Sequence, residues 1–280
     1  MSRFLMILAI LAAFVIDANA QKNGDIRQVD FKNFTYEPFC AGEDSQKIKV
    51  KDGEFTEEKE VDGYTDRLYF SASVEAYGDV DGDGRDEAII SSVCNTGGTG
   101  NFTEGFVYTM RGGRAVLMTR IEGGDRAYGG IREITVEKGV LTVDRNDPGE
   151  MGGACCPEAA VKIKYKWNGS ELVEFGQPET RQLYPARRIA FARGKSSGTA
   201  VARIPAGEFQ RFVVGAAKGQ VMIVRVKPEN ATVNLRFGDA ETTEDAGFLR
   251  AVLQEKGDYT FEVWNPGEAD GDFTVTVEIK

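Results

Sequence analysis

Histidine is absent from the 280 residues of this chain. Its absence excludes the serine–histidine–aspartate triad, the cysteine–histidine pair and every zinc site with an imidazole ligand. An enzyme built on this sequence would have to work with carboxylates, lysine, tyrosine or a metal ion. We therefore expect a protein that is not an enzyme.

Cysteine is scarce, with four residues and no C-x-x-C spacing, so a zinc site is not indicated either. An even number of cysteines in an exported protein indicates two disulfides. A bond between adjacent residues is strained. We therefore expect Cys40 and Cys94 each to pair with one of Cys155 and Cys156.

Positive charge is in the minority: 34 lysines and arginines face 44 aspartates and glutamates, for a formal net charge of −10. This balance argues against nucleic acid or an anionic membrane as a default partner. It suits a basic protein partner, and many lysozymes are basic.

Long apolar runs are missing after the first residues. Arg3 precedes an apolar run over residues 4–16, and Ala18-Asn19-Ala20 offers small residues for cleavage. The run is too short to span a bilayer comfortably. We expect a signal peptide over residues 1–20, cleaved near Ala20, and a periplasmic or secreted mature protein without a transmembrane anchor. An uncleaved membrane anchor is the alternative.

An acidic stretch at residues 79–90 carries the clearest chemical signal. A hard cation such as calcium takes six to eight oxygen ligands, and acids at alternate positions let one short loop supply most of them. We expect a structural calcium ion held by the side chains of Asp79, Asp81, Asp83 and Glu87 and the carbonyl of Arg85. The stretch resembles the short calcium loop of FG-GAP and dockerin-type repeats. A solvated acidic turn is the alternative.

Hairpin signals follow this loop. Strand-like runs flank glycine-bearing turns, which is the strongest short-range signal of a β-hairpin. We therefore expect an antiparallel β-meander domain over residues 21–177. The paired runs are residues 106–110 with 115–121, 131–136 with 140–143, and 161–167 with 171–175. Two glycine-rich loops, at residues 95–101 and 147–153, are either binding edges or flexible connectors.

The first domain resembles a family of bacterial exported proteins and lipoproteins in three features. They are the stretch at residues 78–90, the Cys155-Cys156-Pro157 segment and the lysine-rich hairpin of residues 161–175. The resemblance covers residues 68–175. It implies export and a fold, and no chemistry.

A second domain is predicted over residues 187–280, after a linker at residues 178–186. Its strand-like runs are short and alternate in polarity, which predicts a small β-sandwich. The clearest runs are residues 221–226, 233–237, 259–263 and 273–279. The basic residues at positions 181–195 are either an anion-binding strip or a strand start that pairs with the acidic first domain.

Three segments of this second domain, residues 188–197, 216–222 and 255–260, resemble the periplasmic inhibitors of animal-type lysozymes and the pre-peptidase C-terminal domain fold that they share. The resemblance implies that a loop near the Gly-Asp-Tyr turn contacts the partner. The residues concerned are Lys256, Gly257, Asp258, Tyr259 and Trp264. Tyr259 is alternatively a core residue of a strand.

The resulting hypothesis is an exported, non-enzymatic binding protein, stabilised by calcium, that recognises a protein or glycan of the cell envelope. Lysozyme inhibition is one alternative. A second is a glycoside hydrolase that uses two carboxylates, such as Asp125 with Glu150 or Asp147. A third is a structural or adhesive module with an exposed aromatic patch around Trp264.

Overall fold

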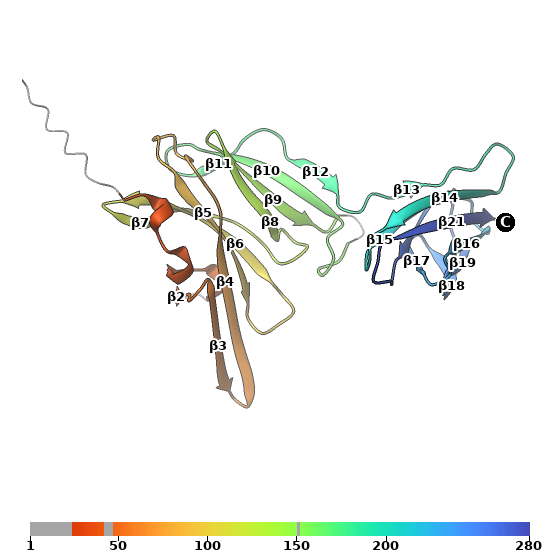
Figure 1. The fold of residues 1–280 in the computed structure, drawn as a ribbon, viewed down its shortest axis with the longest axis horizontal. Coiled ribbons are helices and arrows are strands. Elements are labelled where there is room, and N and C mark those ends of the chain that lie inside the picture. Colours follow the sequence, from red (N-terminus) through yellow and green to blue (C-terminus); the bar gives the residue numbers. More distant parts are fainter. Residues whose placement is uncertain (1–23, 42–46, 150–151) are drawn as a thin grey trace, which may run out of the picture.

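The computed structural model describes residues 24–41, 47–149 and 152–280. The regular elements of the described chain are all strands apart from short 3-10 helices, so the predicted all-β class with antiparallel sheets is confirmed. In Figure 1 the sheets of the first half lie at one end of an elongated molecule and those of the second half at the other. The predicted signal peptide falls outside the described residues. Within those residues, no helix has the length and apolarity needed to cross a membrane.

The first sheet is an antiparallel meander of five strands in the order β3-β4-β5-β6-β7. Asp62 and Gly63 connect the first two strands with φ angles of 49° and 84°, the left-handed conformation that a two-residue hairpin turn requires. The strands are β3 (Glu54–Val61), β4 (Tyr64–Gly78), β5 (Glu87–Asn95), β6 (Phe102–Arg111) and β7 (Arg114–Ile121).

The second sheet has the order β11-β10-β9-β8, and β12 pairs with β10 beyond the end of β11. Its hairpins turn at Lys138-Gly139 and at Asn168-Gly169, as the sequence predicts. An apolar layer that includes Val107, Ile134 and Val143 packs between this sheet and the first. The strands are β8 (Ile131–Glu137), β9 (Val140–Asp147), β10 (Ala159–Trp167), β11 (Leu172–Glu174) and β12 (Glu179–Gln182).

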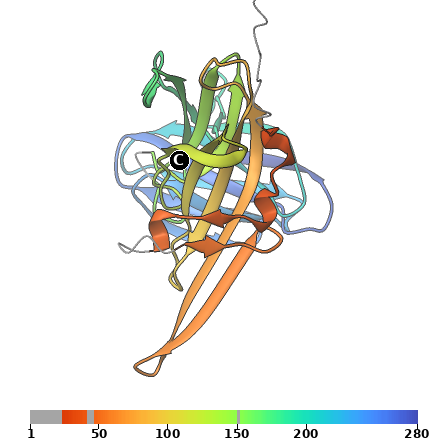
Figure 2. The ribbon, with the colours of Figure 1, turned by 90° about the vertical axis from the view of Figure 1, so that its left-hand side faces the viewer.

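The N-terminal segment covers part of the other face of the first sheet (Figure 2). Tyr36 is fully buried there, with its ring centroid 5.6 Å from those of both Phe70 and Phe106. Burial of rings this large supplies much of the local stability. The segment comprises η1 (Ile26–Gln28), η2 (Phe31–Asn33), β1 (Thr35–Tyr36), η3 (Phe39–Ala41) and β2 (Ile48–Lys49).

The predicted disulfide pairing is wrong. Cys40 bonds to Cys94, with their Cα atoms 6.3 Å apart, and Cys155 bonds to its neighbour Cys156. Strand β5 presents Cys94 on the face that the N-terminal segment covers, so Cys40 lies within disulfide reach. The adjacent cysteines lie instead in a turn before β10 of the second sheet.

The second half is a β-sandwich with one hydrophobic core. In β21 the alternating Phe273, Val275, Val277 and Ile279 are buried, as their spacing predicts. One sheet contains β13 (Arg187–Arg188), β15 (Phe209–Ala216), β20 (Gly257–Trp264) and β17 (Thr232–Phe237). The other contains β14 (Ser197–Ile204), β21 (Gly271–Ile279), β16 (Val221–Lys227), β19 (Phe248–Leu253) and β18 (Ala240–Asp245).

A buried ionic cluster joins the two halves. Arg211 of β15 is 5% exposed; its Nη2 lies 3.1 Å from Oε1 of Glu158, and its Nε lies 2.9 Å from Oε1 of Glu262. Arg236 donates to the same Glu158 oxygen at 2.7 Å. Nearby, Arg181 of β12 pairs with Asp144 of the second sheet at 2.6 Å, so this part of the basic segment does pair with the acidic first half.

The cluster predicts that Glu158→Ala destabilises the fold by roughly 3–5 kcal/mol, because it leaves the Arg211 charge buried and short of a partner. Urea unfolding of the mature protein measures the loss. The control Glu179→Ala removes an exposed ion pair with Lys164 and should change stability by about 1 kcal/mol or less. Equal losses in the two variants would contradict this role of Glu158.

The same cluster predicts a pH dependence. Burial alone would raise the pKa of Glu158, but hydrogen bonds from Arg211 and Arg236 outweigh it and hold the pKa below the ordinary 4.5. The stability that this depressed pKa contributes is therefore complete above pH 4.5 and is lost as pH falls through the folded-state pKa. We expect acid to destabilise the wild type more steeply than Glu158→Gln. Parallel pH–stability curves from urea titrations would contradict this.

Candidate functional site

The acidic loop between β4 and β5 folds around its own carboxylates. Oδ1 of Asp79 accepts from the Gly82 amide at 2.7 Å, and Oδ2 accepts from the Gly84 amide at 3.0 Å. Both glycines have φ near +80°, a conformation that is strained for other residues. Val80, 3% exposed, anchors the loop in the core between the sheets.

Three of the predicted calcium ligands converge. One carboxylate oxygen each from Asp79, Asp81 and Glu87 lies within 4.8 Å of the other two. Glu87 is fully buried, and its oxygens accept from the Val80 amide and the Thr109 hydroxyl, each at 2.9 Å. Burial raises the pKa of Glu87, although these hydrogen bonds oppose the shift. An all-oxygen set of this kind suits a hard cation.

The other acids of the loop have different partners. The Asp83 carboxylate accepts from the Arg85 amide at 2.9 Å and from the Arg85 guanidinium at 3.0 Å, outside the converging group. Asp86 pairs with Arg27 of η1 at 2.7 Å. The structure thus brings together three of the four predicted side-chain ligands.

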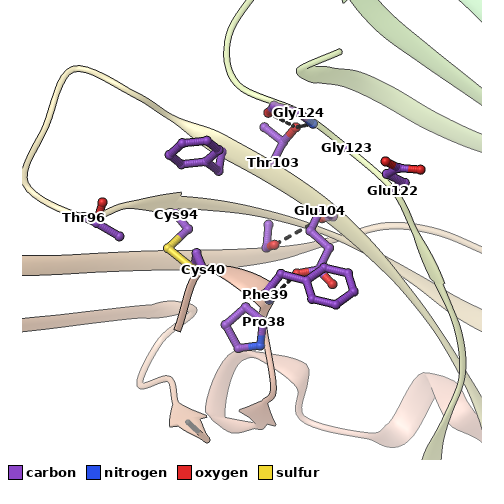
Figure 3. A pocket seen from close by; sticks show the side chains of 12 residues that line it. Pro38, Phe39, Cys40, Cys94, Thr96, Thr103, Glu104, Glu122, Gly123 and Gly124 are labelled. Carbon is purple, nitrogen blue, oxygen red and sulfur yellow. Dashed lines mark hydrogen bonds between the residues drawn. A yellow bond between two sulfur atoms is a disulfide. The ribbon is translucent and has the colours of Figure 1, made fainter. Parts of the chain in front are cut away.

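A pocket of about 670 Å³ opens on the face of the first sheet that the N-terminal segment covers only in part (Figure 3). Its floor follows from register: Phe70 of β4 lies opposite Cys94 of β5, which lies opposite Phe102 of β6, so these side chains share one face. Phe39 and Phe102 are 73% and 47% exposed. The lining residues are Pro38, Phe39, Cys40, Ser92, Cys94, Thr96, Phe102, Thr103, Glu104, Glu122, Gly123 and Gly124.

One charged pair braces this pocket. Glu104 is 7% exposed; it accepts from the Phe39 amide at 3.1 Å and from the guanidinium of Arg120. The guanidinium carbon lies 4.8 Å from the centre of the Phe39 ring, a cation–π contact. Burial raises the pKa of Glu104, and the Arg120 hydrogen bond opposes that shift. Phe39 is therefore held in place while its ring stays exposed.

Glycines form the opposite wall. The Thr103 amide donates to the Gly124 carbonyl at 2.9 Å, which brings the segment after β7 against β6. A Cβ atom on Gly123 would lie 2.0 Å from the Thr103 carbonyl oxygen, so only glycine permits this approach. Glu122 is exposed beside them and adds a carboxylate to the pocket.

Sequence reasoning missed this pocket. Its walls come from four separate segments, and only strand register brings them together. The one available signal was the glycine-rich loop at residues 95–101, which the sequence left as either a binding edge or a flexible connector and which supplies Thr96 to the lining.

The contact residues predicted in the second half are not gathered into one surface. Lys256, Gly257 and Asp258 are exposed, and Asp258 pairs with Arg188. Tyr259 is 1% exposed, and its hydroxyl donates to the Glu255 carbonyl at 2.8 Å, so it is a core residue of β20. Trp264 is half-buried, and its ring centroid lies 4.6 Å from that of Phe209.

The acids named for glycoside hydrolysis are engaged in local contacts. The Asp125 carboxylate accepts from the Asn101 amide at 2.7 Å and from Arg126 at 3.1 Å, and the Arg126 hydrogen bond lowers the pKa of Asp125. A general acid needs the opposite shift. Asp147 accepts from the Gly149 amide at 2.6 Å, and Glu150 lies outside the described residues.

No protein-family model and no curated protein matches this sequence. Among solved structures, a periplasmic inhibitor of g-type lysozyme from Aeromonas hydrophila aligns over 34% of this chain and 96% of its own, with 18% identity and a TM-score of 0.30. The inhibitor from Salmonella Typhimurium aligns over 33% and 96%, with 22% identity and a TM-score of 0.29. An exo-β-1,3-galactanase from Phanerochaete chrysosporium aligns over 82% and 83%, with 6% identity and a TM-score of 0.20. Likenesses at these scores carry no argument about function.

The glycine wall yields a prediction. Gly123→Ala should push the wall away from β6 and lower the free energy of unfolding by roughly 2 kcal/mol or more, because the added methyl group meets backbone. Gly98→Ala in the neighbouring loop is the matched control, since a Cβ there meets nothing within 4 Å. It should stay within about 0.5 kcal/mol of the wild type. Urea unfolding compares the two variants, and a neutral Gly123→Ala would contradict the described wall.

Proposed function

We propose that this chain is an exported, non-enzymatic binding protein that takes a side chain of a protein partner into the pocket between Phe39 and Phe102. The pocket carries the proposal. Its volume of about 670 Å³ lies within the usual range for ligand sites, and its walls combine apolar rings with a few polar groups.

The chemistry of the pocket favours a side chain with an apolar stem and a cationic end. Phe39, with Arg120 over one face of its ring, and Phe102 both offer exposed ring surface, and the exposed Glu122 offers a carboxylate. Arginine and lysine side chains match such a set, because the stem packs on rings while the head remains near a carboxylate. A chain with a net charge of −10 also attracts basic proteins over a distance.

Calcium stabilisation belongs to the same proposal. Asp79, Asp81 and Glu87 would hold the ion, which would offset the mutual repulsion of three close carboxylates. Their loop joins β4 to β5, and β5 carries Cys94 of the pocket floor. The ion would therefore brace the sheet that forms the site, and it has no chemical step to perform.

Inhibition of a lysozyme is a narrower form of this function. The net negative charge suits a basic enzyme as the bound partner. The acidic pocket and the exposed loop at Lys256 are two different surfaces that could make the contact. An assay of g-type lysozyme activity in the presence of the purified mature protein tests this narrower function. Undiminished lysis at micromolar protein would contradict lysozyme inhibition and leave the broader binding proposal unaffected.

We predict that calcium raises the thermal unfolding midpoint of the mature protein and that chelator reverses the rise. A calcium concentration of one hundred times Kd should raise the free energy of unfolding by about 2.7 kcal/mol. Asp81→Ala should abolish the effect, whereas Asp86→Asn, in the same loop but paired with Arg27, should retain it. Equal responses of the two variants, or no response of the wild type, would remove the calcium proposal.

A selection experiment tests the pocket. A random peptide library displayed on phage is selected on immobilised mature protein, and the retained peptides are measured against Phe102→Ser and Phe175→Ser. The two phenylalanines are equally exposed, at 47%, but only Phe102 lines the pocket. We expect about tenfold weaker binding to Phe102→Ser alone. Equal binding to both variants, or no selected peptides, would contradict the proposed function.

A further inference from the structure

The hairpin of β3 and β4 extends past the body of the molecule (Figure 2). Strand β4 gains β5 as its second neighbour only from Tyr69 onward, so residues 57–68 form a ribbon of two strands. We call residues 57–68 the arm. A two-stranded ribbon without a covered face is marginally stable in water.

One face of the arm continues the apolar face of the first sheet. Tyr64, Asp66, Leu68 and Phe70 alternate along β4 and therefore point to one side; Val61 lies directly opposite Tyr64, and Lys59 lies opposite Asp66. Phe70 is buried, Leu68 is half-buried, and Tyr64 and Val61 are 80% and 50% exposed. This face is thus apolar at its base and at its uncovered tip, with the charged Asp66 and Lys59 between them.

The arm and the pocket belong to this same face. Phe70 lies opposite Cys94, whose side chain lines the pocket, and Cys94 lies opposite Phe102. At the base of the arm, a Cβ atom on Gly97 would lie 3.5 Å from the Arg67 carbonyl oxygen, so the loop that follows β5 packs against the arm. Pocket and arm are therefore neighbours on one continuous surface.

The arm is acidic. It contains five acidic residues and two basic ones. Lys59 pairs with Glu57 at 2.8 Å and Arg67 with Glu58 at 3.0 Å, so both cations of the arm are already paired. Asp62 and Asp66 lie on either side of Tyr64 along the chain. The exposed ring at the tip is therefore flanked by net negative charge.

We propose that the arm and the pocket together form one docking surface for a basic protein, which places apolar side chains on Tyr64 and Val61 and cations beside Asp62 and Asp66. Charge decides between the possible occupants: a second copy would bring two acidic arms together, which like-charge repulsion disfavours. A basic partner would offset that charge and cover the exposed apolar tip. This inference rests on the proposed function and adds to it a second contact area.

The probes are the peptides selected from the phage library. Their binding to two variants of the full mature chain is compared with their binding to the wild type. Tyr64→Ser with Val61→Ser removes the apolar tip. Asp62→Asn with Asp66→Asn removes two charges, and asparagine tolerates the positive φ at position 62. The matched control is Val201→Ser, 57% exposed on the sandwich. All of these side chains are exposed, so thermal unfolding should confirm an unchanged fold.

We expect peptides rich in lysine and arginine, bound about tenfold more weakly by each arm variant and equally well by the control. Their affinity should also fall as salt is raised. Peptides that lose affinity for Phe102→Ser but not for the arm variants would overturn this inference and leave the pocket proposal intact. Peptides without excess positive charge would overturn the partner chemistry. A library that yields nothing would overturn both proposals.

Discussion

The first sheet has an apolar face that the chain covers only in part, and most of the structure follows from this constraint. The N-terminal segment buries Tyr36 against Phe70 and Phe106. The Cys40–Cys94 bond fastens its end to β5. The same face stays uncovered in two places away from that bond: at Phe102 in the pocket and at Tyr64 at the tip of the arm. Large uncovered apolar patches on a protein surface mark interaction sites, and the proposed docking surface rests on this relation.

Rigid attachments hold this face in position. The loop that carries Asp79, Asp81 and Glu87 joins β4 to β5, the central strand of the first sheet, and places a buried carboxylate against Thr109 of β6. Glu158, directly before β10 of the second sheet, pairs with Arg211 of β15 and so fixes the sandwich to the first half. An unpaired buried charge is costly, so these contacts favour a single arrangement of the two halves.

Local patterns predicted about half of the strands that the structure describes, because alternation and turn residues act over a few positions. The run from Phe273 to Ile279 is one such case. The calcium ligand set stays a prediction: three of its acids converge, and the Asp83 carboxylate accepts from the Arg85 side chain. Tertiary features were out of reach. The pairing of Cys40 with Cys94 and the placement of Phe39 and Phe102 in one pocket depend on contacts between segments far apart in the chain, which a single sequence does not encode locally.

Amide hydrogen exchange of the mature protein, measured with and without a selected basic peptide, tests the central claim most directly. The account predicts slower exchange over residues 57–68 and in the segments around Phe39 and Phe102, and little change in the sandwich. Protection confined to the sandwich, for instance around Lys256, would contradict it.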